Sequence, residues 1–559
     1  MPAFAEKLAR AVQVWIQNYN PLGNSVLSTA VAALPVTLLF YLLAVRRLAA
    51  HWSAVWAFAC GVVVALVVFR MPAGMLAAAV GHGFVYAALR IAWILVAAVF
   101  IYDLTVESGH FETIKASIGG ITDDRRLQAL LIALAFGAVL EGAGGGGAPV
   151  AVCGAMMIGL GFKPFETAVM CLLANTAPVA FGGMGNPVRT LVAVTGLAEP
   201  DLAAMTGRIV FLTALILPLW LVRTMTGWRN TLRVWPGLAV CGIAFAGTQL
   251  FWSNCIDGTL VNVVGGMFTL LLCAVFFRFW QPAPIWRYPE DPPVAELARN
   301  RHTTRQVLHA WSPFLLLAVF VVLWGLPSVK HLLESTDYRM PAPGLHNMVL
   351  RTPPIVPRNH PEPAIMELAW LSTIGTGTFL AGLLAGPILG LSLGRTLRVF
   401  GRTNWRLRYS LLAIVAMICL GFVTRYCGMD AILGLAMTNT GWLYPMFGTL
   451  IGWLGTAMSG TDAGSNALFG SLQVITANKL GLSPVLMAAA NTAGGVMGKM
   501  IGAQSVIVAC VATGLEGKEG DVFRAVVKHS IALTLLVGLI VMFFAYAAPG
   551  LVPNGHKWW

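Results

Sequence analysis

Four ionisable residues lie deep within apolar regions of this 559-residue chain: Glu141, Arg189, Asp462 and Lys499. Bringing a charge into a membrane costs free energy unless the charge is paired or hydrated, so each of the four is a candidate for a functional role. A carboxyl desolvated in the bilayer can bind and release a proton, which makes Glu141 and Asp462 candidate proton carriers. The alternative is a paired charge that only locks two helices together.

The stretch LEGAGGGGAPVAV, residues 140–152, cannot be a regular helix through its middle, because four consecutive glycines weaken it and Pro149 removes a backbone donor. Open backbone at membrane depth is tolerated only where protein or a water-filled cavity surrounds it. A half-helix beginning after this break would present free N–H groups and a positive dipole end, which suits a carboxylate. The predicted substrate-binding residues here are Gly145, Gly146, Gly147 and Ala148.

A second stretch, SGTDAGSNALFGS at 459–471, places hydroxyl and amide groups ahead of another apolar helix, and such groups suit a hydroxylated polar solute. Two Asn-Thr pairs repeat the design elsewhere, one followed by Ala-Pro and the other by Ala-Gly. The alternative is that the glycines only allow close helix packing. The predicted substrate-binding residues are Thr461, Gly464, Ser465 and Asn466, the pairs Asn175-Thr176 and Asn491-Thr492, and the cations Arg189 and Lys499.

The two interrupted regions, 127–197 and 428–515, resemble each other. The first contains LGFKP, LLANTAP and VTGL in that order, and the second contains LGLSP, AAANTAG and ATGL. A chance match of common membrane residues is the alternative, but the register of these strings is nearly kept. An internal repeat of this kind is the expected construction of a secondary transporter.

The composition determines the class of protein. Hydrophobic residues make up 58% of the chain and charged residues only 11%, against about 25% charged residues in soluble domains. Apolar runs of roughly 20 residues, the length that crosses a bilayer, recur along the sequence. We therefore predict an all-α polytopic membrane protein with about 12–16 transmembrane segments and two inverted repeats that contain broken or re-entrant helices. No cleavable signal peptide is expected at the amphipathic start.

The positive charge indicates orientation. The net charge of +13 comes from residues clustered in loops between apolar spans, which is typical of cytoplasmic loops rather than of nucleic-acid binding. The crossings counted between these loops make the two repeats run in opposite directions. The predicted division is an N-terminal half, 1–280, with repeat 1 at about 84–200; a cytoplasmic basic linker, 281–310; and a C-terminal half, 311–559, with repeat 2 at about 409–515.

Other classes find little support. The nine cysteines form no CxxC pair and have no zinc-type histidine spacing, so buried free thiols are expected, with no cofactor and no metal. There is no Walker loop for ATP-driven transport. A membrane enzyme or a receptor is the alternative from another class, and the sequence offers it no nucleophile and base pair and no soluble output domain.

Several long strings carry a family resemblance. They include DRRLQALLIALAFGAVLEGAGGGGAPVA (124–151), ANTAPVAFG (174–182), GTDAGSNALFGSLQ (460–473) and NTAGGVMGKMI (491–501). With these strings, nearly the whole chain resembles the bacterial L-lactate permease family. The resemblance implies symport of a proton with lactate, and in some members glycolate, across the cytoplasmic membrane.

The chain departs from the family pattern at several positions. The family's EGAAGFGTPVA has a bulky residue and a threonine where this chain has Gly146 and Ala148, and its GSDTSSNALFG differs at Thr461, Ala463 and Gly464. Arg189 also lies in a stretch expected to be more apolar in the family. These changes predict a smaller and differently polar pocket, so another small monocarboxylate stays open as the substrate.

The leading hypothesis is proton-coupled uptake of L-lactate and related 2-hydroxy monocarboxylates, including glycolate and D-lactate, by alternating access in the bacterial inner membrane. The expected partners are the substrate, protons and the lipid bilayer, and no nucleic acid. Sodium coupling is the rival, because unwound carbonyls and half-helix ends also coordinate sodium. The sequence leaves the exact solute, its stereochemistry and the oligomeric state open.

Overall fold

A computed structural model of the chain describes residues 14–46, 48–143, 148–289, 303–325, 327–356, 358–515 and 518–555. Almost all regular structure is helical, as predicted, because an apolar chain in a bilayer must satisfy its backbone polar groups within each segment. The helices before the predicted linker are α2 (Ser25–Phe40), α3 (Ala50–Val67), α4 (Ala73–Tyr86), α5 (Trp93–Glu107), α6 (His110–Gly119), α7 (Arg125–Ala129), α8 (Gly137–Ala143), α9 (Ala148–Gly159), α10 (Pro164–Ala174), α11 (Thr176–Val179), α12 (Gly182–Thr195), α13 (Glu199–Leu232), α14 (Trp235–Cys255) and α15 (Val261–Phe279).

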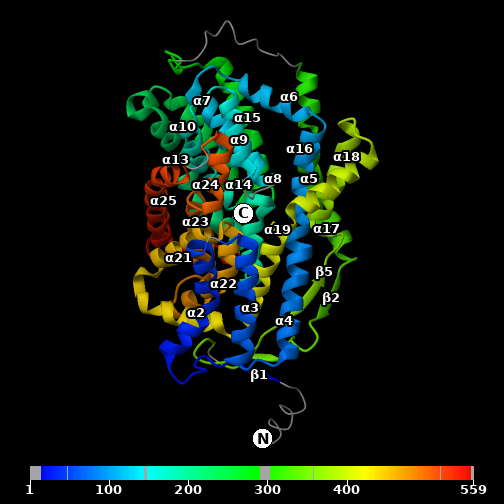
Figure 1. Cartoon of the computed structure of the whole chain (residues 1–559), viewed down its shortest axis with the longest axis vertical. Coiled ribbons are helices and arrows are strands. Elements are labelled where there is room, and N and C mark those ends of the chain that lie inside the picture. Colours follow the sequence, from blue (N-terminus) through cyan, green and yellow to red (C-terminus); the bar gives the residue numbers. More distant parts are fainter. Residues whose placement is uncertain are drawn as a thin grey trace, which may run out of the picture.

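The second half of the chain continues the helical arrangement (Figure 1). Its helices are α16 (Thr304–Gly325), α17 (Pro327–Glu334), α18 (Ile374–Ile388), α19 (Leu393–Cys427), α20 (Met429–Met437), α21 (Tyr444–Ser459), α22 (Asp462–Leu480), α23 (Pro484–Lys499), α24 (Ala503–Thr513) and α25 (Glu519–Met542). π-Helical stretches join α4 to α5 and α7 to α8, so each of these pairs is one continuous rod.

Eight of the described helices are long and apolar enough to cross a membrane, or nine if the bent pair Pro164–Val179 and Gly182–Thr195 counts as one span. Shorter apolar helices, among them α9 and α18, fall below this length, and the predicted number of 12–16 segments stays a prediction. One of the eight, Arg125–Ala143, is buried over its whole apolar window. It therefore lies inside the protein and does not face lipid.

The basic loops meet at one end of the molecule, which we call the basic end. The rings of His51 and Tyr409 stack 4.5 Å apart, and Arg406 Nη2 lies 2.7 Å from Asp103 Oδ1. Arg126 Nη1 donates to the Asn230 carbonyl oxygen at 2.7 Å. These contacts bring loops that are distant in sequence to one side, as the positive-inside pattern requires, and Figure 1 shows α7 and α10 at the top of the view.

The opposite end, called the outer end, carries two small sheets (Figure 1). In the first, β1 (Trp15–Ile16) pairs in parallel with β3 (Val349–Arg351), which pairs antiparallel with β4 (His360–Pro361). In the second, β2 (Tyr338–Pro341) pairs antiparallel with β5 (Ile365–Leu368). The sheets fold the Pro-rich segment, which the sequence predicts to be an external loop, against the N-terminal strand.

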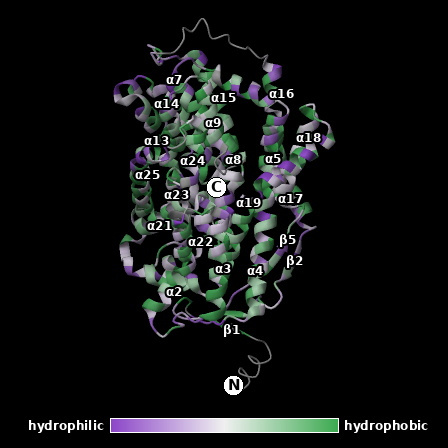
Figure 2. Ribbon diagram, in the orientation of Figure 1, coloured by the Kyte–Doolittle hydropathy of each residue, from purple (hydrophilic) through white to green (hydrophobic). Residues whose placement is uncertain are grey.

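The core is formed mainly by the two interrupted regions. One large buried cluster joins apolar residues of α7–α12 with those of α21–α25, and a second joins α2–α4 to α19, α20 and α22. Figure 2 shows apolar colouring along most helices, with hydrophilic segments at the top and beside β2 and β5. The interrupted regions therefore occupy the interior, where open backbone is tolerable.

Candidate functional site

The first interrupted region begins with a helical hairpin at the basic end. The rod α7–α8 enters the protein and α9 returns beside it, since Cys153 Sγ on α9 contacts the carbonyl oxygen of Ile132 at 3.2 Å. Both ends of this hairpin lie at the basic end, where Arg125 N donates to Trp286 O at 3.1 Å. The predicted binding residues Gly145, Gly146 and Gly147 lie outside the described residues. Helix α9 starts at Ala148, as predicted.

The second interrupted region contains a matching hairpin at the outer end. Helices α21 and α22 run antiparallel, because Gln473 Nε2 donates to Gly448 O at 2.8 Å and Ser465 Oγ donates to Gly452 O at 3.0 Å. Gly460, with a φ of 77°, makes the turn. Thr461 then caps α22 by accepting from the Gly464 N–H at 3.0 Å. Thr461 and Gly464 thus form the hairpin tip.

Each hairpin is followed by a broken helix. In the first, α10–α11 and α12 meet at an angle of 50°, across Gly183, Met184 and Gly185, all at positive φ. In the second, α23 ends at Lys499 and α24 begins three residues after Met500. The halves interlock, because α9 packs on α24 and α12 packs on α22. The two regions therefore share one order of elements: hairpin, then broken helix.

Glu141 lies at the inner end of α8 and is buried, with 3% of its surface exposed. Its Oε2 atom has no hydrogen-bond partner among the described residues. A Cβ added to Gly182, at the break of the other helix, would lie 2.6 Å from Glu141 Oε1. Only glycine at 182 therefore leaves room for this carboxyl.

Asp462 is the first residue of α22 and is equally buried. Its Oδ1 atom lies 3.4 Å from Thr456 Oγ1, while Oδ2 has no hydrogen-bond partner within the described part of the chain. A Cβ added to Gly495 on α23 would lie 2.0 Å from Asp462 Oδ1. Both carboxyls thus occupy space left by a glycine on the neighbouring broken helix.

Lys499 ends α23 and points into the second hairpin tip. Its Nζ atom donates to the carbonyl oxygen of Gly460 at 2.7 Å, at the C-terminal end of α21, where the helix dipole favours a cation. No ion pair within 4.0 Å joins Lys499 to Glu141 or Asp462 in the described part of the chain, yet each carboxyl acts on it electrostatically. The three charges therefore share one buried region without being locked together.

The polar residues of the second repeat are bonded to one another. Asn466 donates to Thr492 Oγ1 at 2.7 Å and to the Pro187 carbonyl oxygen at 3.0 Å, and it accepts from Asn491 at 2.8 Å. Asn491 also accepts from Gln473 at 3.0 Å. This network fixes α22, α23 and α12 relative to one another, so these predicted binding groups hold helices together in this structure.

The equivalent Asn-Thr pair of the first repeat is arranged differently. Thr176 Oγ1 donates to the Leu173 carbonyl oxygen at 2.7 Å, within its own turn. Asn175 is buried beside Glu141, and neither its Oδ1 nor its Nδ2 atom makes a hydrogen bond of ordinary geometry. The first repeat therefore offers an amide and a carboxyl with unused hydrogen-bonding capacity.

Arg189 lies apart from the other three charges. Its Nη2 atom donates to Thr259 Oγ1 at 2.9 Å, and its Nε atom lies 3.5 Å from Glu199 Oε1 in the segment that begins α13. It thus sits on the outer half of the first broken helix. The structure brings Glu141, Asp462 and Lys499 together and leaves Arg189 on the outer side.

Two residues that the sequence did not single out support the first break. Gln249 on α14 donates to the Ala177 carbonyl oxygen at 3.1 Å, and Asn262 on α15 donates to that of Pro178. The side-chain oxygen of each amide has no hydrogen-bond partner among the residues that the structure describes. Both lie in ordinary apolar spans, and the only available signal was an isolated amide in such a span.

Comparison with known proteins agrees with the architecture. A family model described as L-lactate permease matches residues 28–548. The chain belongs to the L-lactate permease family.

The glycolate permease GlcA of Escherichia coli K12 is 41% identical, over 96% of this chain and 99% of its own length. The L-lactate permease of Salmonella typhimurium is 40% identical over 97% of this chain and 100% of its own length. The L-lactate permease of Bacillus subtilis is 38% identical over 96% and 100%. The resemblance noted from the sequence is thereby confirmed across nearly the whole chain.

Proposed function

We propose that this permease imports L-lactate and related short 2-hydroxy monocarboxylates, including glycolate and D-lactate, together with a proton, across the bacterial cytoplasmic membrane. Relatives of near-equal identity are named for lactate and for glycolate, which supports a substrate class that covers both. Their sources are bacteria, which supports the bacterial cytoplasmic membrane as the location. A transport role also fits a chain with many apolar helices.

The observation that carries this proposal is the buried set of Glu141, Asp462 and Lys499. Both carboxyls act electrostatically on Lys499, whose Nζ donates to the Gly460 carbonyl oxygen. Each carboxyl has one oxygen without a hydrogen-bond partner among the described residues. Entry of one proton and one monocarboxylate leaves the formal charge of this region unchanged. Because uncompensated charge at membrane depth is costly, loading both together is favoured over loading either alone.

Lys499 and the first turns of the half-helices that start at Ala148 and Asp462 are the proposed anchors of the substrate carboxylate. The Gly464 N–H could bind the substrate only in place of its contact with Thr461. Asn175 and Thr176 lie near Glu141 and are proposed to contact the hydroxyl group. The amides of the second repeat would take part only if the helices they join were to separate. Arg189, on the outer half of its helix, is proposed to meet the substrate on entry.

The test is uptake of labelled L-lactate by purified permease in liposomes. A proton gradient without sodium should drive accumulation above the equilibrium level, and glycolate and D-lactate should compete. Accumulation that requires a sodium gradient would replace proton coupling by sodium coupling. Absence of uptake under both gradients, in liposomes that contain folded protein, would contradict the function itself.

A further inference from the structure

Three charged side chains meet at the outer end, away from the transport site. Glu362, only 5% exposed, lies between two arginines: Arg425 Nη2 is 2.7 Å from its Oε1 atom, and Arg351 Nε is 2.8 Å from its Oε2 atom. Arg425 Nη1 also donates to the Ala193 and Val194 carbonyl oxygens at 3.2 and 3.3 Å. This outer ionic cluster joins the external segment, α19 and the end of α12.

Asp430, on the short helix α20, adds a second carboxyl beside this cluster. It is buried, and its Oδ1 atom accepts from the Ala431 N–H at 2.7 Å. Its Oδ2 atom accepts a hydrogen bond from Ser471 Oγ, on the returning arm of the outer hairpin. Asp430 therefore connects the hairpin α21–α22 to helix α20, which is not part of that hairpin.

The charged and titratable groups that face Asp430 come from three elements. Arg351 of β3 and Arg425 of α19 act on it electrostatically, as do Tyr19 of the N-terminal segment and Cys427 of α19. Glu362 reaches it only through the two arginines. In the described chain, the contribution of α22 is the Ser471 hydroxyl, so a change in the charge of Asp430 is felt directly by the hairpin.

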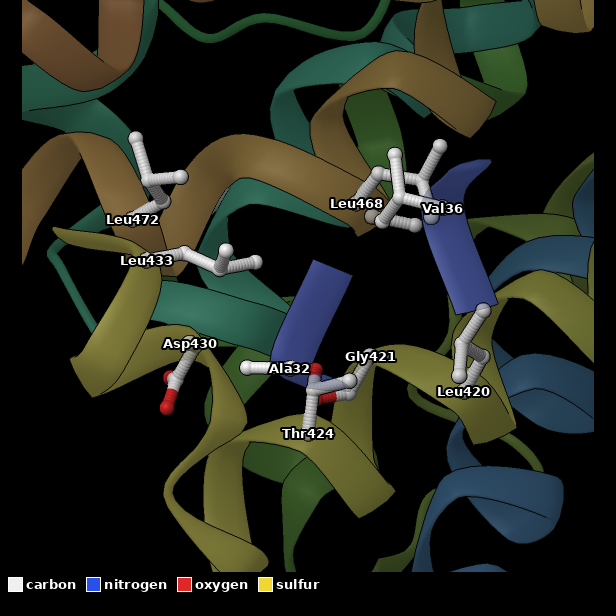
Figure 3. A pocket seen from close by; sticks show the side chains of 10 residues that line it. Ala32, Val36, Leu420, Gly421, Thr424, Asp430, Leu433, Leu468 and Leu472 are labelled. Carbon is white, nitrogen blue, oxygen red and sulfur yellow. The ribbon is translucent and has the colours of Figure 1, made fainter. Parts of the chain in front are cut away.

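A small gap in the packing lies beside Asp430. A cavity of about 10 Å³ lies where α2, α19, α20 and α22 meet, close to the smallest space that holds one water molecule. Figure 3 shows Asp430 at its edge, with Leu433 and Leu472 on one side and Ala32 and Thr424 on the other. Apolar contacts across such a gap are incomplete. Two polar contacts join α22 to α20 here: Ser471 donates to Asp430, and Thr476 Oγ1 donates to the Gly434 carbonyl oxygen at 2.9 Å. The first of these depends on the charge of Asp430.

We propose that Asp430 is a positioning residue: while charged, it holds the outer hairpin closed through Ser471, and a proton from the outer solution releases that hairpin. The inference rests on the proposed function, because it assigns to the hairpin α21–α22 the movement that opens the site outward. It adds a proton-binding carboxyl outside the central site, on the path by which protons and substrate enter.

The chemistry of the carboxyl supports this role. A hydrogen bond to an ionised carboxylate is roughly twice as strong as one between neutral groups, so protonation weakens the contact with Ser471. Burial raises the pKa of Asp430 to about 6, while Arg351 and the Ser471 hydrogen bond lower the pKa by less. The carboxyl is therefore charged at neutral outer pH and loses its charge as the pH falls through about 6.

The test is exchange of labelled for unlabelled L-lactate in right-side-out membrane vesicles with the inner pH fixed. Exchange needs no net proton movement, but outer pH also sets the protonation of the central carboxyls. Exchange is therefore measured at saturating lactate, and the difference between the unmodified permease and Asp430→Asn reports access to the site. In the unmodified permease the exchange rate should rise several-fold as outer pH falls through about 6. Asp430→Asn, which carries no charge, should exchange at the fast rate at both pH values.

Ser471→Ala removes the same contact and leaves the carboxyl in place, so it should also be fast at both pH values. The double variant Asp430→Asn with Ser471→Ala should exchange at the same rate as either single variant, since both changes remove the same interaction. Asp521→Asn, an exposed Asp→Asn control at the basic end, should behave as the unmodified protein. If Asp430→Asn does not fold, Ser471→Ala decides the question alone.

The proposal is overturned if Asp430→Asn or Ser471→Ala shows the same rise in exchange rate with falling outer pH as the unmodified permease. Slow exchange by either folded variant at both pH values overturns it as well. Absence of exchange in the unmodified permease at every pH would instead contradict the transport function. The two failures are therefore distinguishable in one experiment.

Discussion

Glu141 is the residue whose role is most directly testable. Among the residues that the structure describes, its Oε2 atom has no hydrogen-bond partner, and the carboxyl lies beside the amide of Asn175. If it carries the coupled proton, Glu141→Gln should abolish accumulation driven by a proton gradient. Exchange of substrate for substrate should remain measurable, because exchange needs no net proton movement. Both are measured with labelled lactate in liposomes.

Glu112→Gln is the matched control, since Glu112 is an exposed glutamate at the basic end. It should leave both accumulation and exchange unchanged. Unchanged accumulation in Glu141→Gln would transfer the role to Asp462.

A substitution at Lys499 gives the second test at the scale of single residues. Its contact with the Gly460 carbonyl leaves it free to change partners, and both nearby carboxyls act on it. Lys499→Gln should weaken substrate binding and also shift the pH dependence of transport, because the lysine stabilises the charged form of whichever carboxyl it faces. Competition binding and pH profiles measure the two effects.

Lys528→Gln, at an exposed lysine, serves as the control. Weaker binding with an unaltered pH profile would leave Lys499 as a simple anchor. Normal binding would assign the substrate carboxylate to backbone amides at the half-helix starts.

Individual residues were predictable only where charge made them conspicuous. Glu141, Asp462 and Lys499 stand out because a charged side chain in an apolar region costs free energy unless it is paired or hydrated. The structure brings these three residues together. Arg189 is also a charge in an apolar region, but it pairs with Glu199, just beyond the end of helix α12. No sequence pattern indicates which way the outer half of α12 points. Asn262 is uncharged within a regular span, so nothing marked it.

At the scale of elements, glycines set the distance between helices α21 and α23. A Cβ added to Gly452 would lie 2.0 Å from the Asn491 carbonyl oxygen, and one added to Gly498 would lie 2.1 Å from that of Trp453. Gly452→Ala should therefore separate the helices and destabilise the permease by about 1–3 kcal/mol, the usual cost of overpacking. Thermal unfolding in detergent measures the effect.

Gly247→Ala on α14 is the matched control, because a Cβ there meets no atom within 4 Å. It should leave the unfolding temperature unchanged or raise it slightly, since alanine favours helix. Equal behaviour of the two variants would show that α21 and α23 can move apart at no cost.

Breaks in helices were easier to predict than the paths that follow them. The four glycines and Pro149 correctly predict an interruption before α9, and the Asn-Thr strings mark the broken helices. Whether α9 crosses the membrane or turns back was open in the sequence. Its 12 residues span about 18 Å, short of the roughly 30 Å core, and the contact between Cys153 and Ile132 shows that it turns back.

At the scale of the whole molecule, the charge pattern predicted which loops lie together. Contacts such as His51 with Tyr409 and Arg126 with Asn230 agree with one basic end. The division at 281–310 stays a prediction, and residues 290–302 of that linker lie outside the described part. In space the two sequence halves interleave, because α19 of the second packs on α3 and α4 of the first.

The inverted relation of the repeats is the remaining prediction at this scale. The first hairpin has both ends at the basic end and is followed by a broken helix that leads to the outer end. The second hairpin has both ends at the outer end, and its broken helix leads back, since Lys499 lies inside and α24 packs on α9. Opposite paths with the same order of elements are what a twofold axis in the membrane plane produces.

An experimental structure should therefore superpose residues 127–197 on residues 428–515 by a rotation of about 180° around an axis parallel to the membrane. The rotation should exchange the pair α9 and α24 with the pair α22 and α12, because each pair joins a hairpin arm to the last half of the opposite broken helix. Superposition about an axis along the membrane normal would contradict the inverted relation of the repeats. Both hairpins would then open to the same side of the membrane, and equivalent movements could not expose the central site to each side in turn.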